Sequence, residues 1–198
     1  AGAFAAAAEA EVTSQLAVVA GTAGPGNLHL INGLFDAQRS RVPVLAIAAH
    51  IPSTEIGTGY FQETHPQELF RECSVYVEHI SDVGQLPRVL TIAMRNAIEQ
   101  RGVAVLVLSG SMFLTDMPDA TPEIIRPAHS RILPSTGALD RAAAALNEAK
   151  KVTILAGAGV AGAHTELLEV AELLQAPIVH AMRGKEHVEY DNPYDVGM

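Results

Sequence analysis

Two glycine-rich turns carry residues whose types and spacing suit the binding of a cofactor. The first turn, Gly24-Pro25-Gly26-Asn27, stands between the apolar run LAVVAG and a segment with helical spacing. Proline fixes φ, glycine permits close backbone approach, and asparagine favours a helix start. The turn is therefore either a plain strand-to-helix connection or a backbone surface that lies against a cofactor.

The second turn, GAGVAG, has the G-x-G-x-x-G spacing at Gly157, Gly159 and Gly162. It follows an apolar strand and opens a helix, as a phosphate-binding turn does. An NAD site also needs an acidic residue about 20 residues further on, but that position falls in the basic stretch IVHAMRGK. The pattern disfavours NAD and leaves open a different nucleotide-type ligand or a plain tight turn.

A loop and three histidines are further candidates. The loop GYFQETHP places Phe61 and Gln62 among polar groups, which suits either a ligand pocket or a solvated loop. His50, His180 and His187 stand at or after predicted strand ends, where open α/β sheets bind ligands. No G-x-S-x-G elbow and no zinc-ligand spacing occurs, so we predict no metal ligands here.

The elements that position these residues alternate between buried strands and helices. Continuous apolar runs are typical of strands that a parallel sheet buries on both faces, so the pattern predicts an α/β fold. We expect strands over 16–21, 42–49, 74–80, 103–110, 152–160 and 176–182, and helices over 3–12, 27–39, 66–72, 83–100, 136–151 and 164–175.

Composition narrows the functional classes. The 198 residues are 48% hydrophobic with a net charge of −9, so the chain buries a core and carries no basic surface for nucleic acid. A single cysteine, Cys73, excludes an internal disulfide and fits a reducing cytoplasm. No apolar run reaches the roughly 18 residues that span a bilayer.

A proline-rich segment divides the chain. Pro118, Pro122, Pro127 and Pro134 interrupt both helix and strand patterns. We therefore predict one domain over 1–115, a linker over 116–134 and a second domain over 135–198.

The quoted motifs together resemble a known family. Three stretches are similar to the pyruvate oxidase branch of the thiamine-diphosphate enzymes, and most similar to bacterial quinone-dependent pyruvate dehydrogenases. They are the stretch from Ala20 through GPGNLHLINGLFDAQRS, the stretch IPSTEIGTGYFQETHPQELFREC and, later, APIVHAMRGKEHVEYDNPYDVGM. The resemblance covers nearly the whole chain. It implies a parallel-sheet pyrimidine-binding domain that lacks its beginning, followed by the first half of a Rossmann-like central FAD domain.

The resemblance also implies roles for individual residues. Gly24, Pro25, Gly26 and Asn27 match the turn against the pyrimidine of thiamine diphosphate, and Phe61 and Gln62 match the pair that lines the substrate pocket. Gly157, Gly159, Gly162, Arg183 and Gly184 match the stretches near FAD.

Other expectations concern the parent enzyme. By resemblance, the activating glutamate lies upstream of Ala1 and the Mg²⁺ site lies outside this chain, so these residues alone would be inactive. The parent would oxidise pyruvate to acetate and CO₂, pass electrons to ubiquinone or menaquinone, form a homotetramer, and be cytoplasmic with peripheral inner-membrane contact through a segment absent here. The alternatives are an acetolactate synthase and a non-catalytic binding module.

Overall fold

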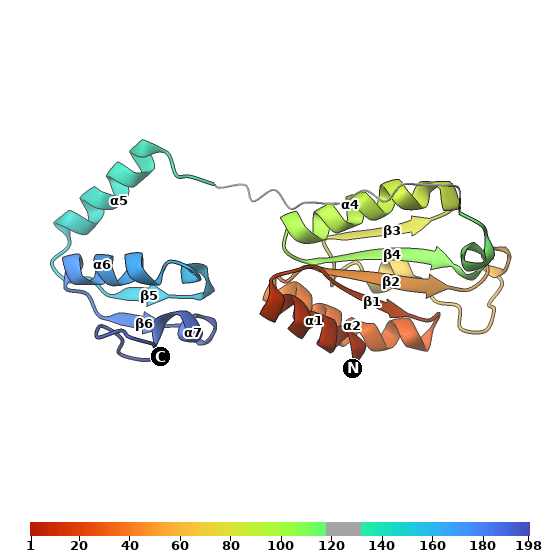
Figure 1. The fold of residues 1–198 in the computed structure, drawn as a ribbon, viewed down its shortest axis with the longest axis horizontal. Helices are drawn as coiled ribbons and strands as arrows, with labels where there is room; N and C mark the ends of the chain where they lie inside the picture. The colour runs from red at the N-terminus through yellow and green to blue at the C-terminus, as the bar shows by residue number, and fades with distance from the viewer. Residues whose placement is uncertain (118–131) are drawn as a thin grey trace. The chain divides into compact units, whose positions relative to one another are not determined.

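The computed structural model describes residues 1–117 and 132–198. These residues form two compact units, which Figure 1 colours from red to green and from teal to blue. Most of the predicted linker, 116–134, lies outside the described residues, so its bounds stay a prediction.

The first unit is built on a parallel sheet. Its four strands have the order β1-β2-β4-β3, and every neighbouring pair is parallel. Parallel neighbours require crossover connections, and helices supply them. The elements are α1 (Gly2–Thr13), β1 (Ala17–Gly21), α2 (Pro25–Ser40), β2 (Val44–His50), α3 (Pro66–Leu69), β3 (Tyr76–Ile80), α4 (Leu86–Glu99) and β4 (Val103–Ser109), with short 3₁₀ turns at Ser53–Glu55, Val83–Gln85 and Gly110–Leu114.

Helices cover both faces of this sheet. Alternate residues of the central strands point to opposite faces: Val44 packs with α1 and α2, whereas Leu45 packs with α4. Figure 1 shows α4 on one side of the sheet and α1 and α2 on the other. All seven residues of β4 are buried, which explains the uninterrupted apolar run in the sequence.

Small residues let α1 and α2 pack closely. α1 buries only alanines, Ala3, Ala6, Ala7 and Ala10. A Cβ at Gly33 of α2 would lie 2.6 Å from the backbone carbon of Ala3. We infer that any larger residue at Gly33 would push the two helices apart.

The second unit has a smaller core. It contains α5 (Thr136–Glu148), β5 (Ile154–Ala156), α6 (His164–Leu174), β6 (Ile178–His180) and α7 (Lys185–Val188), with 3₁₀ turns at Ala158–Val160 and Met182–Gly184. β5 and β6 pair in parallel, and Asp195 forms an isolated bridge with Ile178 of β6. The core consists of Ala156, Ala171, Ile178 and Val188.

The order and type of the predicted α/β elements are confirmed, with changes at their ends. Of the strand expected over 152–160 only Ile154–Ala156 is strand, and Ala158–Val160 is a 3₁₀ turn. The helix expected over 66–72 ends at Leu69, and its C-cap residue Phe70 is buried in the core with 0% exposure. The helix expected over 83–100 starts as a 3₁₀ turn, in which the Asp82 carboxylate accepts the Gly84 N–H, and α4 follows with Pro87 in its first turn. Among the described residues no helix is both long and apolar enough to span a membrane.

Candidate functional site

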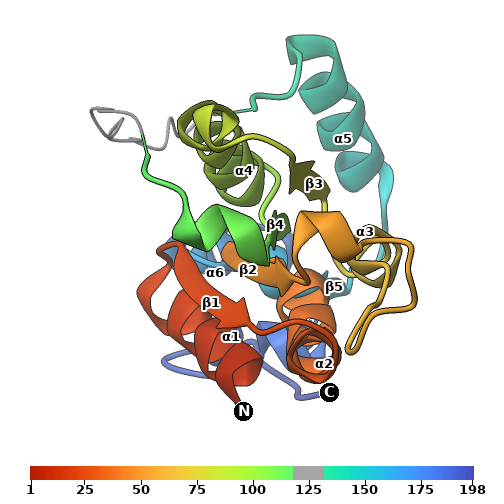
Figure 2. The same cartoon turned by 90° about the vertical axis from the view of Figure 1, so that its right-hand side faces the viewer.

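The candidate site of the first unit lies where its parallel strands end. Figure 2 shows the first unit from this end of its strands. His50 closes β2 and pairs in register with Ser109, the last residue of β4. Ser111 Oγ links the end of β4 to the turn that follows β2, because it lies 3.1 Å from Ser109 Oγ and 3.0 Å from Ser53 Oγ. Open α/β sheets bind their ligands at this carboxyl end.

The structure brings the first glycine turn against the Phe61-Gln62 pair. Gly24 has φ +61°, and a Cβ there would lie 2.8 Å from Gln62 Cβ and 2.9 Å from the Gln62 carbonyl oxygen. Gln62 itself has φ +66°. Side chains avoid both the left-handed backbone and such short contacts. Glycine at position 24 is therefore required for two segments, 38 residues apart in the chain, to touch.

The next residues of the turn fix the start of α2. A Cβ at Gly26 would lie 2.5 Å from Thr22 Cγ2. Asn27 is 0% exposed, its Nδ2 donates to the Ala49 carbonyl at 2.8 Å, and its Oδ1 has no partner among the described residues. Asn27 thus ties the first turn of α2 to the end of β2. Direct contact of these residues with a cofactor stays a prediction.

The loop that carries Phe61 is held by a carboxylate. Glu63 accepts N–H bonds from Gly57, from Gly59 at 2.7 Å and from Tyr60 at 3.1 Å. These bonds, that from Gly57 first, hold the pKa of Glu63 below its ordinary value of 4.5. Phe61 is 80% exposed, so the loop presents its aromatic ring outward while the carboxylate holds the backbone.

Buried polar groups without partners lie behind this loop. Thr64 Oγ1, His50 Nδ1 and His79 Nε2 are all buried and make no hydrogen bond among the described residues. Burial lowers the pKa of His50 below 6.5, the neighbouring His79 lowers it further, and Glu63 opposes them. The two imidazole rings lie 6.5 Å apart, edge to face. His50 is therefore a neutral imidazole near pH 7, able to donate or accept.

The second glycine turn has an open surface. A Cβ at Gly157, Gly159 or Gly162 would meet no atom of the described residues within 4 Å. Gly184 differs, since a Cβ there would lie 2.6 Å from the Ala156 carbonyl oxygen and 3.1 Å from Gly157. The structure thus packs the predicted residue Gly184 beneath the turn, and Arg183 next to it is exposed.

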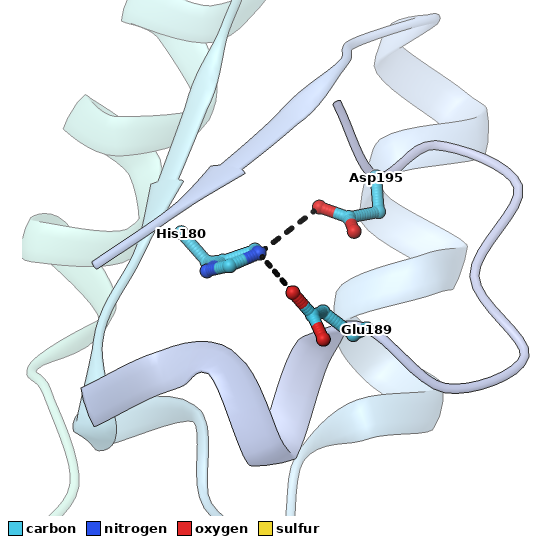
Figure 3. Close-up of side chains that lie close together, drawn as sticks. All are labelled: His180, Glu189 and Asp195. Carbon is cyan, nitrogen blue, oxygen red and sulfur yellow. Dashed lines mark ion pairs between the residues drawn. The ribbon is translucent and has the colours of Figure 1, made fainter. Parts of the chain in front are cut away.

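A third cluster combines one of the predicted histidines with two acids that the sequence did not single out. His180 Nε2 at the end of β6 lies 3.3 Å from Glu189 Oε1 and 3.6 Å from Asp195 Oδ1 (Figure 3). His180 was a candidate because it ends a strand. The acids carry no local motif, and only the return of the chain beside β6 brings them to it.

Comparison with known protein families finds one match in each of the two units. Residues 1–69 match the model "Thiamine pyrophosphate enzyme, N-terminal TPP binding domain", and residues 139–198 match "Thiamine pyrophosphate enzyme, central domain". Thiamine pyrophosphate is the same compound as thiamine diphosphate. The first match ends after the Gly24 turn and the Phe61 loop, and the second contains the Gly157 turn and the His180 cluster.

Known proteins extend the match over nearly the whole chain. An uncharacterized 42.6 kDa protein in the isoamylase 3′ region of Pseudomonas amyloderamosa is 60% identical over 200 residues, 99% of this chain and 50% of that protein. Pyruvate oxidase of Lactiplantibacillus plantarum is 30% identical over 93% of this chain and 31% of its own length. The chloroplastic acetolactate synthase 2 of Zea mays is also 30% identical, over 99% of this chain and 32% of its own length.

The chain thus spans half or less of the length of these relatives. The two family matches are to the N-terminal and the central domain of one enzyme type. A protein named pyruvate oxidase and one named acetolactate synthase are both 30% identical to this chain. The chain thus carries sequence of the N-terminal TPP-binding domain of the thiamine-pyrophosphate enzymes over residues 1–69, followed by sequence of their central domain over residues 139–198.

Proposed function

We propose that the complete protein oxidatively decarboxylates pyruvate to acetate and CO₂ and passes the electrons through FAD to a quinone such as ubiquinone or menaquinone. One observation carries the proposal: Gly24 and Gln62, predicted separately as cofactor turn and substrate pocket, lie side by side, so close that a Cβ added at Gly24 would come within 2.8 Å of Gln62 Cβ. Cofactor and substrate must meet at one place, and this contact brings their predicted residues to one place.

The residues at the strand ends fit thiamine diphosphate. Pro25 is exposed and Gly26 half-buried, so the turn offers backbone surface to a flat ring. The unpartnered His50 Nδ1 and Thr64 Oγ1 are polar atoms available to a ligand or water. When bound, the cofactor supplies the electron sink that permits loss of CO₂ from a 2-keto acid.

The chain's own residues would bind and shield the substrate. The Gln62 amide is exposed and carries two N–H donors, which suit the carboxylate and carbonyl oxygens of pyruvate. Phe61 would cover the reacting carbon and exclude water, since its ring is exposed beside Gln62. Glu63 would hold both residues in place through its bonds to the loop backbone.

The second unit would contribute to the flavin site. The open surface of Gly157, Gly159 and Gly162 suits close approach of a nucleotide, and Gly184 beneath it fixes the turn. Exposed Arg183 would add positive charge near the phosphates. Mg²⁺ would be held by residues outside this chain.

The assembly and location in this proposal rest on the family resemblance. The exposed Phe61 and the turn at Pro25 would be covered by a second subunit in a homotetramer, so that each site forms between chains. The enzyme would be cytoplasmic and reach the inner membrane, where quinones reside, through a segment outside these residues.

Product analysis of the complete protein tests the proposal. The enzyme is supplied with thiamine diphosphate, Mg²⁺, FAD and pyruvate, and CO₂, acetate and acetolactate are measured with and without a quinone. We expect CO₂ release that depends on the acceptor, with acetate as product. Acetolactate formed without an acceptor would overturn it in favour of the synthase, which the equal 30% identity makes the second candidate.

A matched pair of variants tests the role of Gln62. Gln62→Asn keeps the amide and a residue that tolerates positive φ, but shortens its reach. We expect kcat/KM for pyruvate to fall at least tenfold while thermal stability is kept. Gln67→Asn in α3 is the control, because Gln67 is an exposed residue of the same type outside the site; equal effects of both variants would contradict the role.

A further inference from the structure

Three side chains of types that can ligate a metal lie close together in the second unit, and each comes from a different segment. His180 ends β6, Glu189 follows α7, and Asp195 lies on the segment that bridges to Ile178 of β6. One ligand atom of each lies within 4.8 Å of the others. Figure 3 shows the imidazole edge pointing between the two carboxylates.

The histidine in this cluster is buried and lacks a hydrogen bond. Its side chain is 1% exposed, and neither Nδ1 nor Nε2 has a hydrogen-bond partner among the described residues. A buried polar group without a partner is costly, so native structures rarely leave one. The Nε2 atom is aimed at the space that both carboxylates also face.

The charge balance of the cluster favours a cation. Glu189 and Asp195 bring two negative charges to one imidazole. Lys185 Nζ lies 3.4 Å from Glu189 Oε1, but its side chain is 56% exposed and can turn to solvent. Asp195 is only 18% exposed and lies in ion-pair distance of His180. A dication between the three side chains would neutralise both acids.

We propose that His180, Glu189 and Asp195 bind a divalent transition-metal ion, with Zn²⁺ as the best match. Tetrahedral Zn²⁺ with ligands at about 2.1 Å places its ligand atoms about 3.4 Å apart. The Nε2 atom already lies 3.3 Å and 3.6 Å from the two oxygens. An imidazole nitrogen with two carboxylates suits Zn²⁺, Mn²⁺ or Fe²⁺ better than Ca²⁺ or Mg²⁺, which prefer oxygen ligands.

The metal would stabilise the C-terminal part of the second unit by joining three of its segments. Backbone bonds from Ile178 N to Tyr194 O, from Val196 N to Ile178 O and from His180 N to Gly197 O already lay residues 194–197 beside β6. A shared ion would add side-chain bonds between β6, the residue after α7 and this segment.

Zinc binding by the complete protein, purified without a metal-affinity tag, tests this site. The protein is first saturated with thiamine diphosphate and Mg²⁺, and Zn²⁺ is then titrated by calorimetry and counted by mass spectrometry. We expect wild type to bind one Zn²⁺ per chain more than Glu189→Gln does, or to bind it at least tenfold more tightly, and to melt at a higher temperature with Zn²⁺.

Two further variants make the result decisive. His180→Ala should lose the same equivalent of Zn²⁺, and Glu189→Gln guards against a folding defect because Glu189 is 43% exposed. Glu186→Gln is the matched control, since Glu186 lies 3.7 Å from His187 on the surface and should keep the ion. Equal Zn²⁺ binding by wild type and Glu189→Gln would overturn the proposal and leave the direct contacts of His180 with the two acids as the role of the cluster.

Discussion

The two glycine turns look alike in sequence, but the structure uses them differently. At Gly24 and Gly26 the space of the missing side chains is taken by Gln62 and Thr22, at 2.8 Å and 2.5 Å. At Gly157, Gly159 and Gly162 no atom of the described residues comes within 4 Å. The first turn therefore needs glycine for its own folding, whereas packing gives the second turn no reason for it.

This difference separates two explanations of a glycine motif. A glycine that packing demands, such as Gly24, is accounted for by the fold, and it bears on ligand binding through the residues that it brings together. A glycine in open space, such as Gly159, is better explained by something that approaches from outside. At Gly162 the backbone also favours glycine, because its φ is +75°. The following predictions test the contrast, from the largest expected effect to the smallest.

Gly24→Ala should be the most damaging change. The new methyl group would meet Gln62 Cβ and the Gln62 carbonyl oxygen in a left-handed backbone, which costs about 1–3 kcal/mol. We expect a lower melting temperature and at least tenfold weaker thiamine diphosphate binding in the complete protein. Gly57→Ala is the control, because Gly57 has φ +88° but open space; equal losses in both would mean that backbone strain alone, and not the contact with Gln62, matters.

Variants at the second turn should separate effects on protein stability from effects on ligand binding. Gly184→Ala would bring a methyl group to 2.6 Å from the Ala156 carbonyl oxygen, and such overpacking costs about 1–3 kcal/mol. Gly159→Ala should change stability by less than about 0.5 kcal/mol but weaken FAD binding tenfold, as followed by flavin fluorescence. A stability loss in Gly159→Ala would refute the view that its surface is reserved for a ligand.

Acid should open the loop that carries Phe61. The pKa of Glu63 is lowered by its backbone bonds, so its stabilisation is complete above 4.5 and is lost as the pH falls through the folded-state value. The protection factors of the Gly57 and Gly59 amides, which correct for the intrinsic slowing of exchange in acid, should therefore fall on acidification. In Glu63→Gln these amides should have low protection at every pH, whereas the control Glu55→Gln, at a half-buried residue of the same loop, should behave as wild type. Wild-type protection that does not change with pH would contradict this role of Glu63.

Cys73 offers the smallest but most specific signal. Burial raises the pKa of its thiol to about 11, and it is the only cysteine in the chain. Alkylation near pH 8 should be slow in the folded protein and should report opening of the first unit. Gly24→Ala should accelerate it and Gly184→Ala should not, and acceleration by Gly184→Ala would mean that the two units open together.

The order and type of the elements were predictable because both depend on local pattern. The apolar run VAVLVLS becomes a strand buried along its whole length, and the helical spacing after Gly26 becomes α2. Element ends were less predictable. The helix at Pro66 ends at Leu69, and its C-cap residue Phe70 is fully buried, a packing contact that the apolar spacing of so short a segment does not specify.

The sequence by itself determined the alternation of strands and helices, the candidate turns and the resemblance to thiamine-diphosphate enzymes, because these depend on residues close together in the chain. Only the tertiary structure decided which distant residues meet. Gln62 reaches Gly24, and Glu189 and Asp195 reach His180, because strand order and chain return set contacts that spacing does not encode. Those contacts separate glycines required by packing from glycines left open to a ligand.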